Sequence, residues 1–252
     1  MLKYVDIHSH ILPFIDDGSK STEESIKILT ELKNQGITDV FATPHFFPQI
    51  DDAGDFNENL QNSYTELKNA IKDKCVPNIH LGCELLYYYG ISNSDSISQF
   101  CLGGSNFLLL ELAPYKIKNK LLKDIISLRD EKKITPIIAH IERYSYTKNF
   151  GKLLKFIKKE KILTQINASS LFENKSYKTI KKLIKKDIVS FIASDTHSID
   201  ERPPMIEEAL TLIEQNFGQD VKLKLIENSK SLLEKILEES KLNAKNEQLI
   251  TN

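Results

Sequence analysis

The chain contains no tryptophan, two methionines and three cysteines among its 252 residues. The cysteines, Cys75, Cys83 and Cys101, are odd in number and form no Cys-x-x-Cys pair, which is typical of reduced thiols in a cytoplasmic protein. No apolar run approaches the roughly 20 residues that span a bilayer. Asp6 and two histidines interrupt what would be the apolar region of a signal peptide. We therefore expect a cytoplasmic protein without membrane insertion.

A charge excess of either sign is also missing. The 34 Lys and Arg residues nearly balance the 35 Asp and Glu residues, and the net charge is −1. This balance predicts no overall attraction to nucleic acid or to a membrane surface. Lysines do crowd residues 152–186, but they alternate there with Leu, Ile and Phe at helical spacing. We interpret them as solvated helix faces rather than as an anion-binding patch.

The order of apolar patterns predicts an α/β fold. Strand-like runs are expected at 4–11, 37–43, 79–86, 107–112, 135–139, 163–166 and 188–193. Helical patterns are expected at 22–36, 56–72, 118–132, 150–160, before Lys186, 203–216 and 221–238. This alternation implies parallel strands with right-handed crossovers, and seven units suggest a closed TIM-like (β/α)7 barrel. No glycine-rich phosphate loop follows the first strand, which argues against a dinucleotide-binding fold. No linker divides the chain, so we predict one domain over 1–240 and a polar tail over 241–252.

The first strand carries a His-x-His pair. Apolar and polar residues alternate from Val5 to His10, and residues two apart in a strand share a face. His8 and His10 should therefore project side by side, with Cα atoms roughly 7 Å apart, close enough for both imidazoles to bind one divalent cation. Pro13 and a polar loop follow, which places the pair at the end of the strand.

Other metal-binding residue types also fall at or near strand ends. In a β/α barrel the carboxyl ends of the strands converge on the face where active sites form. The candidates are His8, His10, Asp17, His45, Glu84, Glu111, His140, Asp195 and His197. They include five of the six histidines; His80, early in its strand, is interpreted as structural.

This donor set is too large for one cation, which takes four to six ligands. It fits two or three divalent ions, and mixed nitrogen and oxygen donors favour Mn, Fe or Zn over Ca. Clusters of this kind activate a bridging water to hydroxide and promote in-line displacement at phosphorus. Metal-assisted hydrolysis is therefore the predicted reaction class.

Arginine is scarce. The only three are Arg129, Arg143 and Arg202, and the last two follow the candidate ligands His140 and Asp195 closely. The planar guanidinium can bind a phosphate group in a bidentate manner, which favours a phosphate ester as substrate over an amide. A salt bridge to a nearby carboxylate is the alternative for each, and Arg129 is interpreted as a surface residue.

Cysteine-based phosphatase chemistry is excluded, because it requires an arginine six residues after the nucleophilic cysteine. Leu81, Tyr89 and Phe107 occupy those positions. Aromatic residues near the strand ends could form walls for an aryl substrate, although packing of the loops is the preferred interpretation for most of them: Phe46, Phe47, Tyr87, Tyr88, Tyr89, Tyr115 and Tyr144.

Several motifs resemble the polymerase and histidinol phosphatase (PHP) superfamily, and more narrowly its bacterial protein-tyrosine phosphatases of capsule and exopolysaccharide synthesis. The matching segments are DIHSHILPFIDDG (6–18), GITDVFATPHF (36–46), AHIERY (139–144), QINASSL (165–171) and ASDTHSIDERPP (193–204), together with the Glu84 and Glu111 strands. Ile141 and Ser19 stand where proline is common in the family, which affects only local loop geometry.

The resemblance implies a distorted seven-stranded barrel and a trinuclear centre, with manganese as the expected metal. It implies that the nine candidates above are the metal ligands, and that Arg143 and Arg202 contact phosphate. The implied substrate is phosphotyrosine on a bacterial tyrosine kinase that governs polysaccharide export. The alternatives are a small-molecule phosphomonoesterase such as a histidinol-phosphate phosphatase, a metal-dependent amidohydrolase, and a non-catalytic PHP scaffold.

Overall fold

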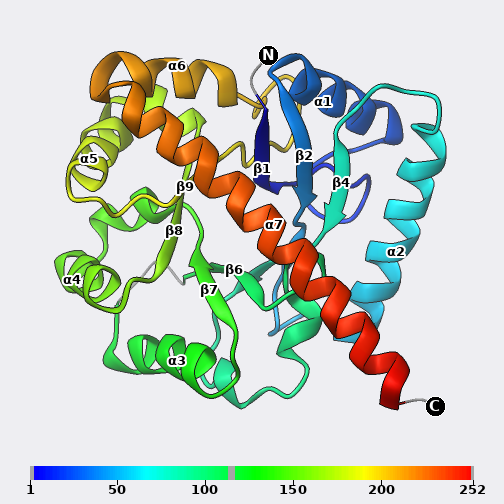
Figure 1. Cartoon of the computed structure of the whole chain (residues 1–252), viewed down its shortest axis with the longest axis horizontal. Coiled ribbons are helices and arrows are strands. Elements are labelled where there is room, and N and C mark those ends of the chain that lie inside the picture. Colours follow the sequence, from blue (N-terminus) through cyan, green and yellow to red (C-terminus); the bar gives the residue numbers. More distant parts are fainter. Residues whose placement is uncertain (1–2, 113–116, 251–252) are drawn as a thin grey trace.

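The computed structural model describes residues 3–112 and 117–250. Strands and helices alternate along this chain (Figure 1). The strands are β1 (Tyr4–Ser9), β2 (Ile37–Ala42), β3 (His45–Phe46), β4 (Asn78–Leu81), β5 (Glu84–Leu86), β6 (Phe107–Glu111), β7 (Thr135–Ile138), β8 (Leu163–Asn167) and β9 (Phe191–Ala193). The helices are α1 (Thr22–Asn34), α2 (Ala53–Ala70), α3 (Asn119–Asp130), α4 (Phe150–Glu160), α5 (Asn174–Lys185), α6 (Ile206–Phe217) and α7 (Gln219–Ile250).

All strand pairs are parallel and form two ladders, β1-β2-β4 and β3-β5-β6-β7-β8-β9. The last strand returns to the first: the amide of Asp195 donates to the carbonyl of His8 at 2.9 Å, and His10 N donates to Thr196 O at 2.9 Å. The sheet therefore curls into a distorted barrel. The predicted single-domain α/β barrel architecture is confirmed.

The described residues form nine strand segments instead of the seven predicted strands, because the predicted strand at 79–86 is interrupted and a short strand, β3, follows the predicted strand at 37–43. β2 and β3 are separated at Thr43 and Pro44, and β4 and β5 at Gly82 and Cys83. Proline has no amide hydrogen to give to a ladder. Hydrogen bonds still cross the break, since Gly82 N donates to the Ala42 carbonyl and Glu84 N to the Pro44 carbonyl, each at 3.0 Å. The interruption redirects the segments that carry His45 and Glu84.

Helix α7 closes one end of the barrel. Leu232 and Ile236 of α7 pack in one apolar cluster with inward-facing strand residues such as Val5, Phe41 and Phe191. Figure 1 shows α7 running diagonally across the strands. The barrel interior is therefore apolar near the strand beginnings, and only the opposite end is left for polar groups.

The last helix is longer than expected. A helix was predicted over 221–238 and a polar tail over 241–252, but α7 continues without a break to Ile250. Asn243 Nδ2 donates to the carbonyl of Gly104 at 2.9 Å, so the helix contacts the barrel beyond residue 240. Although α7 has 32 residues, no helix in the described part of the chain is long and apolar enough to cross a bilayer.

Candidate metal centre

Strand alternation places several of the candidate ligands inside the barrel. Phe107 and Leu109 belong to the apolar cluster in the barrel interior. Glu111 is the next alternate residue of β6 and therefore lies on the same face of the strand. Phe191 and Ala193 precede Asp195 in the same way. Residues two apart in a strand share a face, so these carboxylates continue the inward-facing rows beyond the apolar part.

The His-x-His pair is positioned by a register shift. The pairing of β1 with β2 shifts between Asp6 and Ser9, which is the effect of a bulge or similar irregularity. Val5 and Ile7 face the apolar interior, yet His8 and His10 also turn inward above them. The two Nε2 atoms lie 3.1 Å apart and both side chains are buried. The predicted juxtaposition of the pair is confirmed.

Two further candidates have strained backbones. His140 has φ of 32° and Asp195 has φ of 50°, both in the left-handed region that non-glycine residues rarely adopt. Each follows the end of a strand, β7 or β9, and the left-handed residue turns the chain sharply there. Such strain persists where surrounding contacts enforce it, and it is concentrated at functional sites.

Glu84 lies at the centre of the cluster. Its Oε2 is 3.1 Å from His8 Nε2 and 3.0 Å from His45 Nδ1. The same oxygen is 3.5 Å from His10 Nε2, and Oε1 is 2.7 Å from His140 Nε2. One buried carboxylate therefore contacts four imidazoles that come from three separate segments of the chain.

The remaining candidates surround this centre. Asp195 Oδ1 is 3.4 Å from the Nε2 atoms of both His8 and His10. Asp17, whose side chain is 63% exposed, is 3.3 Å from His197 Nε2 and 3.5 Å from His45 Nε2. Three overlapping groups have donor atoms within 4.8 Å of one another: His10, Asp17, His45 and His197; His8, His10, Glu84 and Asp195; and His45, Glu84 and Glu111. His140 is in none of these groups, but it contacts Glu84 and lies 3.7 Å from Glu111.

Electrostatics favour positive charge in this pocket. Burial raises the pKa of the Glu84 carboxyl, but the neighbouring His8 and His140 lower it by more. The pKa of Glu84 therefore lies well below its usual range. Burial similarly opposes ionisation of Asp195, whose pKa nevertheless lies well below its usual value beside His8 and His10. Both carboxylates are therefore ionised and need cations as partners. Burial and the neighbouring His10 lower the pKa of His197 to about 3, so this imidazole is neutral and can act as a ligand.

The donor set fits divalent metal ions. Two ring nitrogens at the site, His45 Nδ1 and His197 Nε2, are buried atoms without a hydrogen-bond partner. His45 Nδ1 is close to Glu84 Oε2, but its orientation does not satisfy hydrogen-bond geometry. A buried polar atom normally has a partner, and a metal ion would satisfy both nitrogens. Imidazole and carboxylate donors without thiolate suit Mn, Fe or Zn.

Two arginines border the same cluster. Arg143 Nη2 donates to Asp195 Oδ2 at 2.7 Å, and Arg202 Nη2 donates to that oxygen at 2.9 Å. Their side chains are 43% and 38% exposed, so an incoming anion can reach both. Arg129 instead forms ion pairs with Asp130 and Glu160, which confirms its interpretation as a surface residue.

Sequence reasoning missed several residues that orient the candidate ligands. Asp16 Oδ2 lies 2.6 Å from His10 Nδ1 and also accepts from the amide of His45 at 3.1 Å. Of the adjacent pair Asp16 and Asp17, only Asp17 was predicted to matter. The Asp-Asp sequence was a signal for both, but only the loop geometry shows that Asp16 faces His10 while Asp17 is exposed.

Gln165 and Asn167 form a second supporting chain of hydrogen bonds. Gln165 Oε1 accepts from the amide of His140 at 2.8 Å and lies 3.3 Å from His8 Nδ1. Its Nε2 donates to Asn167 Oδ1 at 2.8 Å, and Asn167 Nδ2 donates to Asp195. Partners of this kind fix the orientation of ligand side chains. The two residues were noticed in QINASSL, but no role was predicted for them.

His80 and most of the nearby aromatics lie outside the cluster. His80 Nε2 contacts Asp39 Oδ1 at 3.0 Å, which confirms its structural interpretation. Phe46 is buried against Phe100. Tyr115 lies outside the described residues. Two aromatics do contact the cluster. Phe47 stacks its ring on that of His45 with centroids 5.1 Å apart, and the hydroxyl of buried Tyr144 lies 3.4 Å from His140 Nδ1 and accepts a hydrogen bond from Leu112 N.

Gly18 is expected to be essential for this loop. A Cβ added at Gly18 would lie 2.6 Å from His10 Cβ, would clash with the His10 carbonyl, and would lie 2.8 Å from Asp16 Oδ1. Gly18→Ala should therefore displace His10 or its partner Asp16 and weaken binding of divalent metal by about tenfold or more, the scale seen when such supporting contacts are lost. Metal titration by calorimetry measures this. Gly151→Ala is the matched control, since a Cβ there meets nothing within 4 Å; equal metal affinity in both variants would contradict the expectation.

Two relatives align over most of this chain. It is 31% identical over 247 residues to tyrosine-protein phosphatase CpsB of Streptococcus agalactiae, covering 91% of this chain and 98% of the relative. Tyrosine-protein phosphatase YwqE of Bacillus subtilis is 27% identical over 237 residues, 91% of each chain.

Two solved structures share the fold of this chain. One from a study of YwqE of Bacillus subtilis and CpsB of Streptococcus pneumoniae, described as metal-dependent tyrosine phosphatases, superposes with a TM-score of 0.81 and 25% identity, covering 92% of this chain and 94% of the other. Histidinol phosphate phosphatase of Lactococcus lactis shares the fold with a TM-score of 0.54 and 18% identity, over 85% of this chain and 94% of the other. The model of the CpsB/CapC family, described as capsular polysaccharide synthesis, matches residues 4–234. The chain belongs to the CpsB/CapC family.

Proposed function

We propose that this protein is a metal-dependent protein-tyrosine phosphatase. The observation that carries the proposal is the convergence of five imidazoles and four carboxylates beside two accessible arginines at one end of the barrel. The donors suit divalent cations, and the arginines suit a phosphate dianion. The relatives named as tyrosine-protein phosphatases support the same activity.

The proposed cofactor is two or three divalent ions, with Mn²⁺ preferred and Fe or Zn as alternatives. The proposed ligands are His8, His10, Asp17, His45, Glu84, Glu111, His140, Asp195 and His197. When bound, the ions would supply Lewis acidity and water activation for hydrolysis of a phosphate ester. Asp16, Gln165 and Asn167 would keep the ligands in place.

Arg143 and Arg202 are proposed to bind the phosphoryl oxygens. Both guanidinium groups donate to one oxygen of Asp195, so their Nη2 atoms are directed to nearly the same point. Charge-assisted hydrogen bonds from both would stabilise the negative charge that is redistributed in the transition state. The phenolate leaving group of tyrosine has a conjugate-acid pKa of only about 10, which reduces the need for a general acid.

The proposed partner is a phosphotyrosine-bearing protein, specifically a bacterial tyrosine kinase that regulates capsular or exopolysaccharide synthesis, encountered in the cytoplasm. Family membership supports this proposal. A histidinol-phosphate phosphatase is the second candidate. Only the shared fold favours it, at 18% identity.

The proposal is tested by measuring metal content and substrate preference on the same preparation. Purified protein is analysed for Mn, Fe and Zn, and kcat/KM is measured with and without added Mn²⁺ for a phosphotyrosine peptide and for histidinol phosphate. We expect bound transition metal and a preference for the peptide of about tenfold or more, since a difference of 1.4 kcal/mol in transition-state binding already gives that ratio. Preference for histidinol phosphate, or metal binding without hydrolysis of either ester, would refute it.

A further inference from the structure

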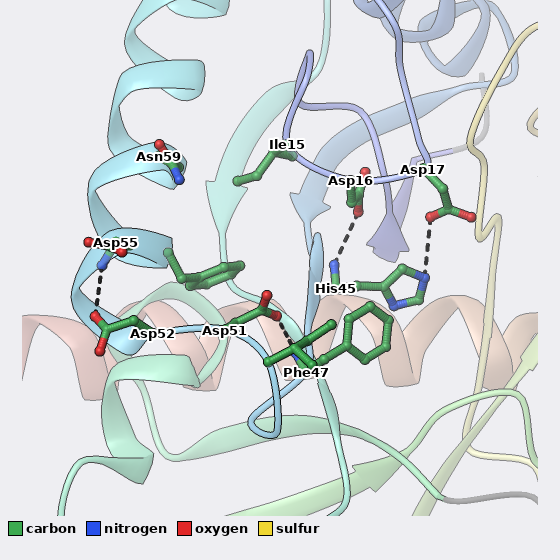
Figure 2. Close-up of a pocket in the computed structure, with 11 residues that line it drawn as sticks. Ile15, Asp16, Asp17, His45, Phe47, Asp51, Asp52, Asp55 and Asn59 are labelled. Carbon is green, nitrogen blue, oxygen red and sulfur yellow. Dashed lines mark hydrogen bonds and ion pairs between the residues drawn. The ribbon is translucent and has the colours of Figure 1, made fainter.

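A pocket of about 490 Å³ opens beside the candidate metal centre and shares His45 and Asp17 with it. It lies between the loop that follows β1 and the start of α2 (Figure 2). The pocket adjoins the candidate metal centre directly. A substrate whose phosphate binds at the metal centre can therefore extend a neighbouring group into the pocket. Phosphate binding by the metals and arginines does not require this space, so its chemistry is a separate source of specificity.

The lining of the pocket is acidic. Asp51 and Asp52 lie on the segment that leads into α2, and Asp55 lies in the first turn of that helix (Figure 2). Asp16 and Asp17 line the pocket from the loop that follows β1. Asp51 accepts a hydrogen bond from Phe47 N at 2.6 Å, and Asp52 accepts from the amides of Gly54 and Asp55. These backbone donors fix two of the carboxylates without neutralising them. None of the described residues that line the pocket is a lysine or an arginine.

The pocket also has apolar lining residues. Ile15 lies on the loop that follows β1, and Phe47 lies across from it beside Asp51 (Figure 2). Ile50, which also lines the pocket, is 79% exposed. The Phe47 ring stacks on His45, which joins the apolar lining to the metal centre. A small neutral group would leave the carboxylates unmatched, and a free metal ion would leave the apolar lining residues without a partner. A lysine or arginine side chain matches both, because its aliphatic stem packs on apolar surface and its charged end pairs with carboxylates or lies over an aromatic ring.

We propose that this pocket binds a lysine or arginine side chain near the phosphotyrosine of the substrate, so that the enzyme prefers basic phosphopeptides. The inference rests on the proposed phosphatase function and adds its substrate class. Asp51, Asp52 and Asp55 are specificity residues that bind the charged end of this side chain, and Phe47 binds its stem.

The test is a positional scan of phosphotyrosine peptides. Each of the three residues on either side of phosphotyrosine is set in turn to lysine or to neutral glutamine in an otherwise uncharged peptide, and kcat/KM is measured with the metal-loaded enzyme. At one or more positions lysine should be preferred by about fivefold, as expected for partly exposed ion pairs of up to roughly 1 kcal/mol. The preference should fall as salt screens the charges.

Variants assign that preference to the pocket. In the triple variant Asp51→Asn, Asp52→Asn, Asp55→Asn the lysine-to-glutamine ratio should fall to about one, since asparagine retains the acceptor oxygens but removes the charge. Comparing two peptides on one enzyme cancels any general loss of activity. Asp73→Asn, which removes an exposed carboxylate beyond the far end of α2, should retain the wild-type ratio.

The outcomes separate this inference from the proposed function. Hydrolysis of all the peptides with equal kcat/KM for lysine and glutamine would overturn the pocket assignment alone. A lysine preference that survives in the triple variant would overturn it as well. If no phosphotyrosine peptide is hydrolysed, the proposed function fails and the pocket assignment fails with it.

Discussion

Glu84→Gln is expected to abolish phosphatase activity and to release bound metal. The substitution keeps the size of the side chain but removes the charge that faces His8, His10, His45 and His140. An amide is a much weaker metal ligand than a carboxylate, and its NH2 group would point toward nitrogens or cations. Losing several kcal/mol of metal-dependent transition-state stabilisation corresponds to a decrease in kcat/KM on the order of 10³-fold.

This loss is measured with an aryl phosphate assay and with elemental analysis after dialysis. Asp39→Asn is the matched control, because it removes the charge of a strand carboxylate that contacts an imidazole, that of His80, away from the centre. Circular dichroism of both variants separates loss of metal from loss of fold. A Glu84→Gln protein that retains stoichiometric metal and near-normal turnover would show that Glu84 is not a ligand.

Arg143→Ala is expected to reduce turnover strongly while leaving metal content unchanged. Arg143 Nη2 donates to Oδ2 of Asp195, whereas the other oxygen of this carboxylate, Oδ1, faces His8 and His10. Arg202 also donates to Oδ2, so Asp195 keeps a cationic partner in the variant. Removing one charged donor from a transition state costs roughly 10²–10³-fold in kcat.

The measurement compares kcat/KM and metal content in Arg143→Ala, Arg143→Lys and Arg129→Ala. Lysine restores the charge without the planar fork and should recover part of the activity. Arg129→Ala removes an arginine that contacts Asp130 and the side chain and carbonyl of Glu160, none of which belongs to the candidate site, and should behave as wild type. Loss of metal from Arg143→Ala would mean that Arg143 acts by holding Asp195 rather than by binding phosphate.

Strand periodicity accounts for how far the fold could be predicted. The seven apolar runs correspond to the seven strand positions, because a strand buried on both faces needs a continuous apolar segment. The end of the second strand at Pro44 was predicted, but the short strand after it and the break at Gly82 were not, since both depend on which neighbouring strand supplies the next hydrogen bond. The length of α7 was underestimated because polar residues near its end resemble a tail, and contacts with the barrel, such as Asn243 with Gly104, are not visible in the sequence.

Residue type and position at strand ends determined the membership of the candidate site. Nine donors and two arginines could be selected without coordinates, because parallel strands bring their carboxyl ends to one face. Tertiary structure alone decided how they meet: Glu84 at the centre, Asp17 at the exposed rim, and Asp16 behind His10. These roles depend on the register shift in β1 and on left-handed backbones at His140 and Asp195. Such local distortions are stabilised by contacts between segments far apart in the chain, such as Asp195 N with the His8 carbonyl and His140 N with Gln165 Oε1, and no local pattern encodes them.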